Sequence, residues 1–137
     1  MIMISREKAL KMIKETGLEN IWELHQRHAF ALRQAVRALG LRLFVDDNSK
    51  ASYAITSIYP PEGISVPDIR KVLKEDYDIV VANGQNALKD KIFRMGTLGF
   101  VSDRDLLTAV SSLEGTLRKL GYEFEIGSGV KALLNAL

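Results

Sequence analysis

The sequence contains no cysteine among its 137 residues. Disulfide bonds, zinc–thiolate sites and thiol catalysis are therefore excluded for this chain. No apolar run approaches the ~20 residues that a membrane-spanning helix requires, and the start, MIMISREKALKMIKE, has too short an apolar segment for a signal peptide. These absences predict a cytoplasmic protein with no membrane partner.

The sequence also lacks a marked excess of either charge. Its 19 Lys and Arg residues nearly balance its 17 Asp and Glu residues, and the formal net charge is +2 at pH 7. Binding to nucleic acid requires clustered basic residues, so this balance argues against a nucleic-acid partner. Hydrophobic residues make up 47% of the chain, an ordinary globular composition. We therefore expect a single domain over residues 1–137, long enough to bury a core.

Helix signals alternate with strand signals along the chain. Apolar residues at i+3/i+4 spacing predict a long helix at about 19–39. Two S-x-x-D sequences, Ser65 with Asp68 and Ser102 with Asp105, predict the starts of two more helices. The other predicted elements are a first helix capped by Ser5, strands at 41–45, 53–59, 77–82, 91–96 and 122–126, and a short helix at 130–137. This order predicts an α+β two-layer sandwich, with helices on one face of a small, mostly antiparallel sheet.

The segment KDKIFRMGTLGF places an arginine, Arg94, inside a short predicted strand. Alternation predicts that Phe93 and Met95 face the core, while Ile92, Arg94 and Gly96 face the other way. A guanidinium is a planar, permanently charged fork that binds a carboxylate through two parallel hydrogen bonds. Arg94 is therefore a candidate carboxylate-binding residue, and a solvated arginine on a strand surface is the alternative.

No other group of residues indicates a catalytic or metal site. His25 and His28 could share a metal, but no third histidine accompanies them, and His25 lies in the apolar stripe of the long helix. Structural roles are therefore favoured for both histidines. Asp46 and Asp47 are adjacent loop residues that indicate a turn, and Trp22 is expected to be a core or interface anchor. The sequence has no nucleophile elbow and no glycine-rich phosphate loop.

Three segments together resemble the C-terminal small domain of class V pyridoxal-phosphate-dependent aminotransferases, the group of alanine–glyoxylate and serine–pyruvate aminotransferases. They are GLENIWELHQRHAFALRQAVRALGLRLF (17–44), ITSIYPPEGISVPDIRKVLKEDYDIVVANGQ (55–85) and LKDKIFRMGTLGFVSDRDLLTAVSSLE (88–114). The third is the most specific, because it is similar to the family's K-x-x-R-I-G-x-x-G followed by a capped helix. The resemblance covers roughly residues 15–120. It implies the small domain of the aspartate-aminotransferase-like fold, with a helical linker region at about 5–40.

The resemblance implies that Arg94 binds the α-carboxylate of the substrate. The whole enzyme would use pyridoxal phosphate to move an amino group between a small amino acid (alanine, serine or aspartate) and a 2-oxo acid (glyoxylate or pyruvate). The family's Schiff-base lysine and other cofactor-binding groups belong to a large domain, which would precede residue 1. The pair Ser49-Lys50 lies in a small-domain loop and does not correspond to that lysine. This chain alone is therefore expected to bind no cofactor and to be inactive.

The sequence departs from the family pattern around the arginine strand. Asn83, Asn86 and Asp90 stand where family members usually have glycines, and Thr97 stands where histidine is common. Asn and Asp tolerate left-handed backbone better than other non-glycine residues, so we expect the loop to keep its shape. These changes bear on substrate specificity rather than on the family.

Two roles remain open for the chain. As an aminotransferase small domain, present as a truncated product, an isolated domain or a proteolytic remnant, it would have the large domain as its partner. Without that partner, apolar side chains around Leu10, Ile13 and Trp22 are uncovered, and we expect self-association. The alternative is a free-standing, non-catalytic α+β module that binds an amino acid or a protein partner.

Overall fold

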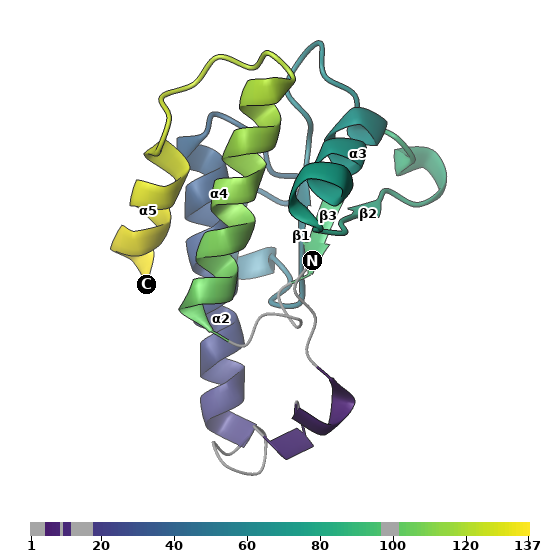
Figure 1. The fold of residues 1–137 in the computed structure, drawn as a ribbon. Helices are drawn as coiled ribbons and strands as arrows, with labels where there is room; N and C mark the ends of the chain where they lie inside the picture. Colours follow the sequence, from purple (N-terminus) through teal and green to yellow (C-terminus); the bar gives the residue numbers. More distant parts are fainter. Residues whose placement is uncertain (1–4, 9, 12–17, 97–101) are drawn as a thin grey trace.

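The computed structural model describes residues 5–8, 10–11, 18–96 and 102–137. Three helices lie side by side, and a fourth lies next to a small sheet (Figure 1). The helices are α2 (Leu18–Ala38), α3 (Val66–Tyr77), α4 (Asp103–Lys119) and α5 (Ser128–Ala136). Helices α2, α4 and α5 contact one another, whereas α3 contacts α4 and the sheet. None of the described helices is long and apolar enough to cross a membrane.

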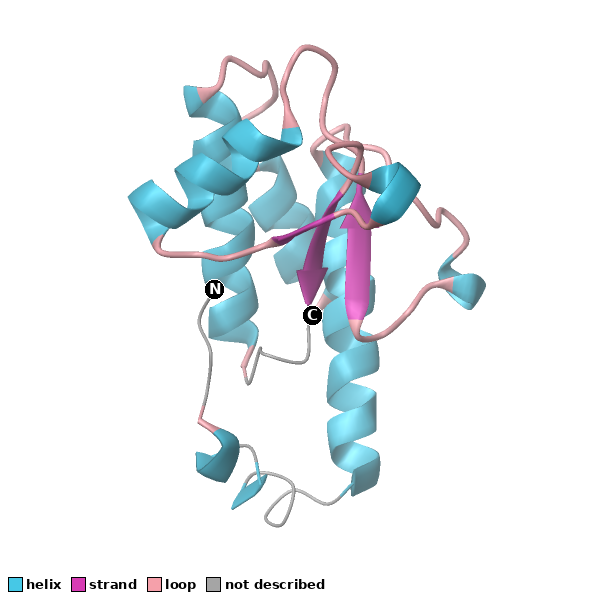
Figure 2. Cartoon of the chain, turned by 90° about the vertical axis from the view of Figure 1, so that its right-hand side faces the viewer, coloured by secondary structure: helices cyan, strands magenta, loops and turns pink. Residues whose placement is uncertain are grey.

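The sheet has the strand order β1–β3–β2 in the described part of the chain, and both neighbouring pairs are antiparallel. The strands are β1 (Ile55–Ile58), β2 (Ala82–Asn83) and β3 (Phe93–Gly96). The strands lie in front of α2 in Figure 2, and helices cover only one face of the sheet. Ile55, on the other face, is exposed. This architecture confirms the predicted α+β sandwich.

The core lies between the sheet and the helices. Ile58, Phe93 and Met95 form its sheet side, and all three side chains are fully buried. The helix side follows the predicted i+3/i+4 spacing, which places these residues on one face of each helix. The buried residues at this spacing are Leu32, Val36 and Leu39 in and just after α2, and Leu106, Val110, Leu113 and Leu117 in α4. Each such side chain stabilises the fold by about 1.5–3 kcal/mol through removal of apolar surface from water.

Helices α3 and α4 begin at the predicted serine caps. The hydroxyl of Ser65 accepts a hydrogen bond from the backbone N–H of Asp68 at 3.2 Å, and that of Ser102 accepts one from Asp105 at 3.3 Å. A side-chain oxygen at this position satisfies a backbone donor that has no partner within the helix. The hydroxyl of Ser5 likewise accepts a hydrogen bond from the backbone N–H of Lys8 at 3.1 Å. All three predicted caps are therefore confirmed.

The predicted strand at 41–45 is wrong, except at one antiparallel bridge between Leu43 and Ile58. Two backbone hydrogen bonds form this bridge, from Tyr59 N–H to the Arg42 carbonyl and from Phe44 N–H to the Ser57 carbonyl, each at 2.9 Å, and the segment is otherwise irregular. The reason is that a side chain of α2 binds this backbone. The buried Arg33 donates from its terminal guanidinium nitrogen to the carbonyl of Val45, which draws the segment toward α2.

The predicted strand at 77–82 is also wrong over most of its length. Tyr77 still belongs to α3, and Asp78 then ends the helix in a left-handed conformation with φ 56°. The residues after Asp78 run alongside α3, where the Nε of Arg70 donates a hydrogen bond to the carbonyl of Val81 at 3.0 Å. Only the two residues of β2 pair with another strand.

The predicted strand at 122–126 is absent as well, because this segment packs on the end of α2 instead of on the sheet. The hydroxyl of Tyr122 donates to the carbonyl of Leu39 at 2.7 Å. The rings of Tyr122 and Phe124 are stacked, with centroids 5.6 Å apart. Side-chain contacts to a helix therefore replace backbone pairing here.

A buried glutamate from α4 holds the start of α5. Gly127 precedes α5 with φ 90° and has no side chain that could cap the helix. The carboxylate of Glu114 takes over this task, since it accepts hydrogen bonds from the backbone N–H groups of Gly127 at 2.6 Å and Val130 at 3.2 Å. Glu114 is only 5% exposed. A negative charge is favourable at a helix N-terminus, where backbone N–H groups converge.

The N-terminal half of α2 projects away from the rest of the molecule (Figures 1 and 2). Trp22 on this half is 57% exposed, and its ring meets the edge of Tyr53 with centroids 5.3 Å apart. Trp22 is thus not a core residue, and its role as an interface anchor stays a prediction. Leu10 is also exposed, whereas Ile13 lies outside the described residues.

The exposed apolar side chains of this projection lead us to expect that the isolated chain self-associates at micromolar concentration. Trp22 is the single tryptophan, so its fluorescence should shift to shorter wavelength as association buries it. Trp22→Ser should weaken association by about tenfold or more, as loss of a central aromatic anchor does. Val80→Ser, which changes an exposed apolar residue away from α2, serves as the control. A monomer over the whole micromolar range in sedimentation, with unshifted fluorescence, would contradict this expectation.

Candidate carboxylate-binding site

Arg94 lies on β3, the middle strand of the sheet. The predicted alternation is confirmed within this strand, because Phe93 and Met95 are buried while Arg94 and Gly96 are half-buried. Ile92 was expected on the face of Arg94, but it precedes the strand and is buried. Ile92 packs so closely against Gly84 that a Cβ added to this glycine would lie 2.9 Å from Ile92 Cγ1. The face opposite the core therefore begins with Arg94.

The residues beside Arg94 on the neighbouring strands have short side chains. Ser57 of β1 and Ala82 of β2 are its two cross-strand partners. Gly96 is the next residue of β3 that faces the same way, and it has no side chain. A long cationic side chain thus stands among three small residues on the open side of the sheet.

One hydrogen bond fixes the orientation of the Arg94 guanidinium. Its Nε donates to the backbone carbonyl of Asn83 in β2 at 2.8 Å. In the part of the chain that the structure describes, Arg94 is in no ion pair, and it is half-buried rather than covered by a helix. The two terminal nitrogens carry four further N–H groups, enough for a bidentate bond to a carboxylate.

The loop between β2 and β3 keeps the backbone that the family's glycines would allow. Asn86 has φ 54° and Asp90 has φ 62°, and both values are in the left-handed region. The prediction that these two residues tolerate such backbone is confirmed. Asn83, which was grouped with them, lies in β2 and has no positive φ. Thr97, the other departure from the family pattern, lies outside the described residues.

The side chains of Asn83 and Asp90 bind each other across this loop. Asn83 Nδ2 donates to the Asp90 carboxylate at 2.6 Å, and the backbone N–H of Asp90 donates to Asn83 Oδ1 at 2.8 Å. Both residues were expected to matter only for their backbone conformation. An Asn and an Asp at the two ends of one short loop are the sequence signal for this contact, because the side chain of each can hydrogen-bond to the other residue.

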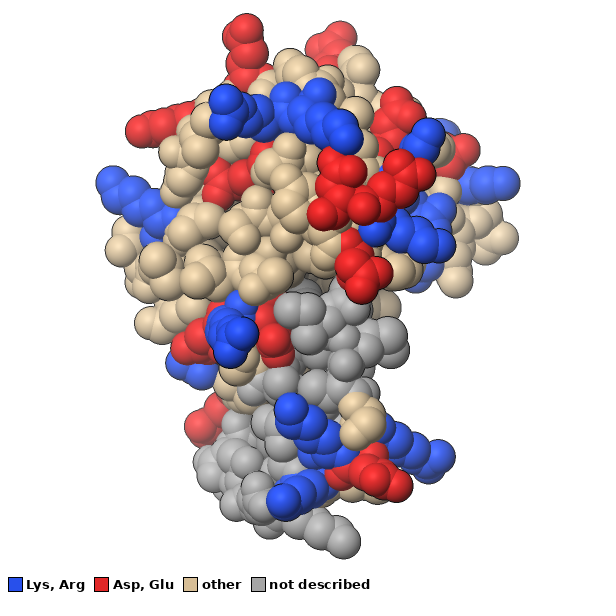
Figure 3. Space-filling model, viewed as in Figure 1, with Lys and Arg blue, Asp and Glu red and all other residues tan. Residues whose placement is uncertain are grey.

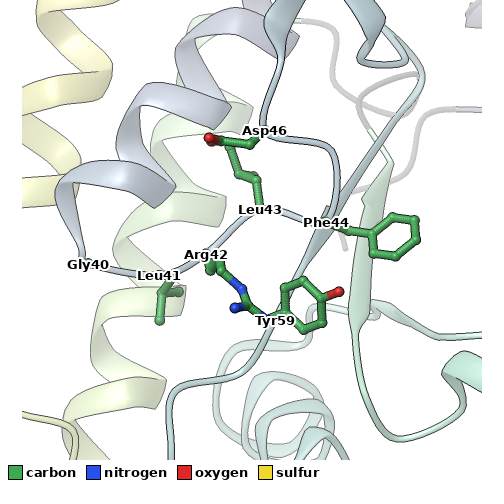
Figure 4. Close-up of a pocket in the computed structure, with 7 residues that line it drawn as sticks. All are labelled: Gly40, Leu41, Arg42, Leu43, Phe44, Asp46 and Tyr59. Atoms are coloured by element: carbon green, nitrogen blue, oxygen red, sulfur yellow. The ribbon is translucent and has the colours of Figure 1, made fainter.

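A separate pocket of about 450 Å³ lies beside the segment that joins α2 to β1 (Figure 4). The Arg42 guanidinium carbon lies 4.3 Å from the ring centroid of Tyr59, and the rings of Phe44 and Tyr59 are 6.0 Å apart. Such stacking of a cation on an aromatic ring is a common surface contact. Arg94 is not among the residues that line this pocket, so the two features are distinct.

The two histidines have structural surroundings. His28 is fully buried, and its Nε2 lies 2.9 Å from the carboxylate of Asp103 at the start of α4. Burial, and to a lesser degree the nearby His28, lowers the pKa of His25, which favours its neutral form. No group of three or more His, Asp or Glu residues within the described ranges is placed to hold a metal ion.

The two adjacent aspartates lie in a turn, as expected. The Asp47 carboxylate accepts hydrogen bonds from the hydroxyl and the backbone N–H of Ser49, and these bonds lower the pKa of Asp47. Asp46 pairs with Arg37 of α2. On the face that Figure 3 shows, acidic and basic side chains are interspersed, without a continuous field of one sign.

No protein-family model matches the chain, but its sequence is similar to part of several longer proteins, aminotransferases among them. It is 46% identical over 137 residues to a Synechococcus sp. (strain PCC 6716) protein named soluble hydrogenase, small subunit, a match of 99% of this chain and 35% of that protein. It is 36% identical over 124 residues to serine–glyoxylate aminotransferase of Arabidopsis thaliana, a match of 90% of this chain and 31% of that enzyme.

A solved structure agrees with these sequence matches. The crystal structure of ureidoglycine–glyoxylate aminotransferase from Bacillus subtilis superposes with a TM-score of 0.84 at 31% sequence identity. The superposition covers 92% of this chain and 33% of that one. The chain therefore spans about a third of the length of the relatives that it matches.

Proposed function

We propose that the chain is the small domain of a class V aminotransferase and the part of that enzyme that binds the substrate's α-carboxylate. Its similarity in sequence and fold to about a third of such enzymes supports this proposal. The enzyme transfers an amino group between a small amino acid (alanine, serine or aspartate) and a 2-oxo acid (glyoxylate or pyruvate). Relatives named serine–glyoxylate and L-aspartate–glyoxylate aminotransferase support this substrate class. The partner of the chain is the large domain of the same enzyme.

The observation that carries the proposal is the Arg94 guanidinium on the open face of the sheet. Its Nε is bound to Asn83, its cross-strand neighbours are small, and no hydrogen bond from its terminal nitrogens to another described residue is found. Carboxylate recognition requires a donor that stays protonated and is held on a rigid element. A strand flanked on both sides by other strands meets this requirement.

Pyridoxal phosphate is the cofactor that the family implies, and it acts as the electron sink for the chemistry at the substrate's α-carbon. The described residues of this chain do not fit its covalent attachment. Every described lysine is exposed, so none is enclosed in a pocket where a Schiff base would be protected from water. We therefore assign the cofactor to the large domain, and Arg94 contributes only substrate binding.

This assignment predicts that the isolated chain does not retain pyridoxal phosphate. After incubation with the cofactor, reduction with borohydride and digestion, mass spectrometry should find at most scattered labelling of surface lysines. One stoichiometrically labelled lysine, together with transaminase turnover, would contradict the prediction. A full-length aminotransferase treated in the same way is the positive control.

The name of the Synechococcus relative does not lead us to propose a hydrogenase function. Iron–sulfur clusters are held by cysteine thiolates, and this chain contains no cysteine. The name describes that protein, of which this chain matches 35%.

The test of the proposed function is activity in a joined enzyme, by which we mean a large aminotransferase domain followed by this chain in one polypeptide. The joined enzyme should transaminate glyoxylate or pyruvate, and the chain alone should not. Translation of the DNA directly upstream of Met1 shows whether the native gene encodes such a large domain. A folded but inactive joined enzyme, with no large domain encoded upstream, would favour the free-standing binding module instead.

A further inference from the structure

The backbone carbonyl of Asn83 decides which edge of the Arg94 guanidinium is available to a ligand. Arg94 has a single N–H on Nε, and that N–H is bound to this carbonyl at 2.8 Å. A carboxylate can therefore bind in bidentate fashion only at the edge formed by the two terminal nitrogens. Any movement of Asn83 would turn this edge away from its ligand.

Several contacts hold Asn83 in place. Its backbone lies in β2, opposite Phe93 of β3, and the next residue, Gly84, donates from its N–H to the carbonyl of Ile92 at 3.0 Å. Strand β2 has only two residues, so this pairing alone is a short support. The two bonds between the Asn83 side chain and Asp90 add a second support on the loop side: one from Asn83 Nδ2 to the Asp90 carboxylate at 2.6 Å, and one from the Asp90 backbone N–H to Asn83 Oδ1 at 2.8 Å.

The side chain of Asp90 is unnecessary for the backbone of the loop. Asp90 has φ 62°, a conformation that glycine adopts without strain. Asp90 is also exposed, so its carboxylate does not satisfy a group that would otherwise be buried without a partner. What the carboxylate adds at this position is the bond that it accepts from Asn83 Nδ2.

We propose that Asn83 and Asp90 form a positioning clamp for Arg94. The clamp holds the Asn83 carbonyl, the carbonyl holds Nε, and the two terminal nitrogens are thereby aimed at the substrate's carboxylate. This inference rests on the proposed function, because it assigns the clamp to the same site. Neither clamp residue touches the substrate; both act through Arg94.

The first test uses the chain as it is and measures hydrogen exchange of the Arg94 Nε–H by NMR. Asp90→Gly removes the carboxylate and keeps the left-handed backbone, and it should speed exchange by about tenfold, the effect of losing one modest hydrogen bond. Asn86→Gly is the matched control, since it makes the same replacement at a left-handed position of the same loop. Asp90→Asn keeps an acceptor and should exchange like the wild type.

The second test measures kinetics in the joined enzyme. Asp90→Gly should raise KM for the 2-oxo acid by about fivefold with little change in kcat, because substrate binding depends on the orientation of the Arg94 guanidinium. Asn86→Gly and Asp90→Asn should leave KM unchanged. In an Arg94→Ala background, Asp90→Gly should have no further effect, since the residue through which it acts is gone.

The results separate the clamp from the proposed function. Unchanged Nε–H exchange in a folded Asp90→Gly chain, or a KM effect that persists without Arg94, overturns the clamp. An Arg94→Ala enzyme with normal KM overturns the proposed function, whatever the exchange data show. If Asp90→Gly fails to fold, Asn83→Ala is tested instead. It removes the bond to the Asp90 carboxylate and also the bond from the Asp90 backbone N–H, and the same results would overturn the clamp.

Discussion

Replacing Arg94 should lower kcat/KM of the joined enzyme by about 10- to 150-fold, because a hydrogen bond to a charged group contributes about 1.5–3 kcal/mol. Arg94→Lys keeps the charge but loses the planar fork and the Nε bond to Asn83. It should therefore fall at the lower end of this range. Arg94→Ala removes charge and fork together and should fall at the upper end or beyond it.

Stability and cofactor content distinguish this effect from misfolding. Arg94 is half-buried and its neighbours are small, so neither variant should change the urea midpoint by more than a small amount. Pyridoxal phosphate should stay bound in both, since its attachment lies in the large domain. Arg118→Lys changes an exposed arginine at the end of α4 and should keep full activity. Equal activity of Arg94→Lys and Arg118→Lys would contradict the assigned role.

The largest loss of stability is expected for Glu114→Gln. The buried carboxylate accepts hydrogen bonds from the N–H groups of Gly127 and Val130, and the glutamine amide offers only one uncharged oxygen in its place. Loss of the charge and of one bond should lower the free energy of unfolding by about 2–3 kcal/mol. The shift should appear in urea denaturation followed by circular dichroism.

The matched control for this variant is Glu123→Gln, which changes an exposed glutamate in the connection between α4 and α5. It should alter the free energy of unfolding by less than about 0.5 kcal/mol, as exposed substitutions usually do. Equal destabilisation by both changes would show that net charge, rather than the cap on α5, is responsible.

The elements that could be predicted from sequence are those defined by their own residues. Helices α3 and α4 begin at Ser65 and Ser102, because a capping serine binds a backbone N–H three residues away. Strand β3 shows the alternation of apolar and polar residues that half-buried strands have. The order of the helix and strand signals then predicted the arrangement of these elements, with helices on one face of a small antiparallel sheet.

The predicted strands that proved wrong are segments whose backbone is held by distant side chains. Arg33 binds the carbonyl of Val45, and Arg70 binds that of Val81. Such contacts depend on which elements pack together, and residue periodicity carries no information on them. The capping role of Glu114 could not be predicted for the same reason. A glutamate in an amphipathic helix is expected to be a surface residue, and only the packing of α5 against α4 buries it.

The candidate site was predictable in part. Arg94 was identified from its strand and from the family motif, and Asn86 and Asp90 were identified as left-handed positions. The bond between Asn83 and Asp90 was not predictable, because it depends on how the loop brings its two ends together. The backbone conformation of this loop could therefore be predicted from the sequence, whereas its side-chain contacts could not.

The central claim is that Arg94 binds the carboxylate of the substrate, and the most direct test compares an acid with its amide. Binding of pyruvate and of pyruvamide to the joined enzyme should be measured for wild type and Arg94→Ala. The account predicts that the wild type prefers the acid by about tenfold or more, and that Arg94→Ala loses most of this preference while its affinity for the amide changes little. An undiminished preference for the acid in the Arg94→Ala enzyme would contradict the claim.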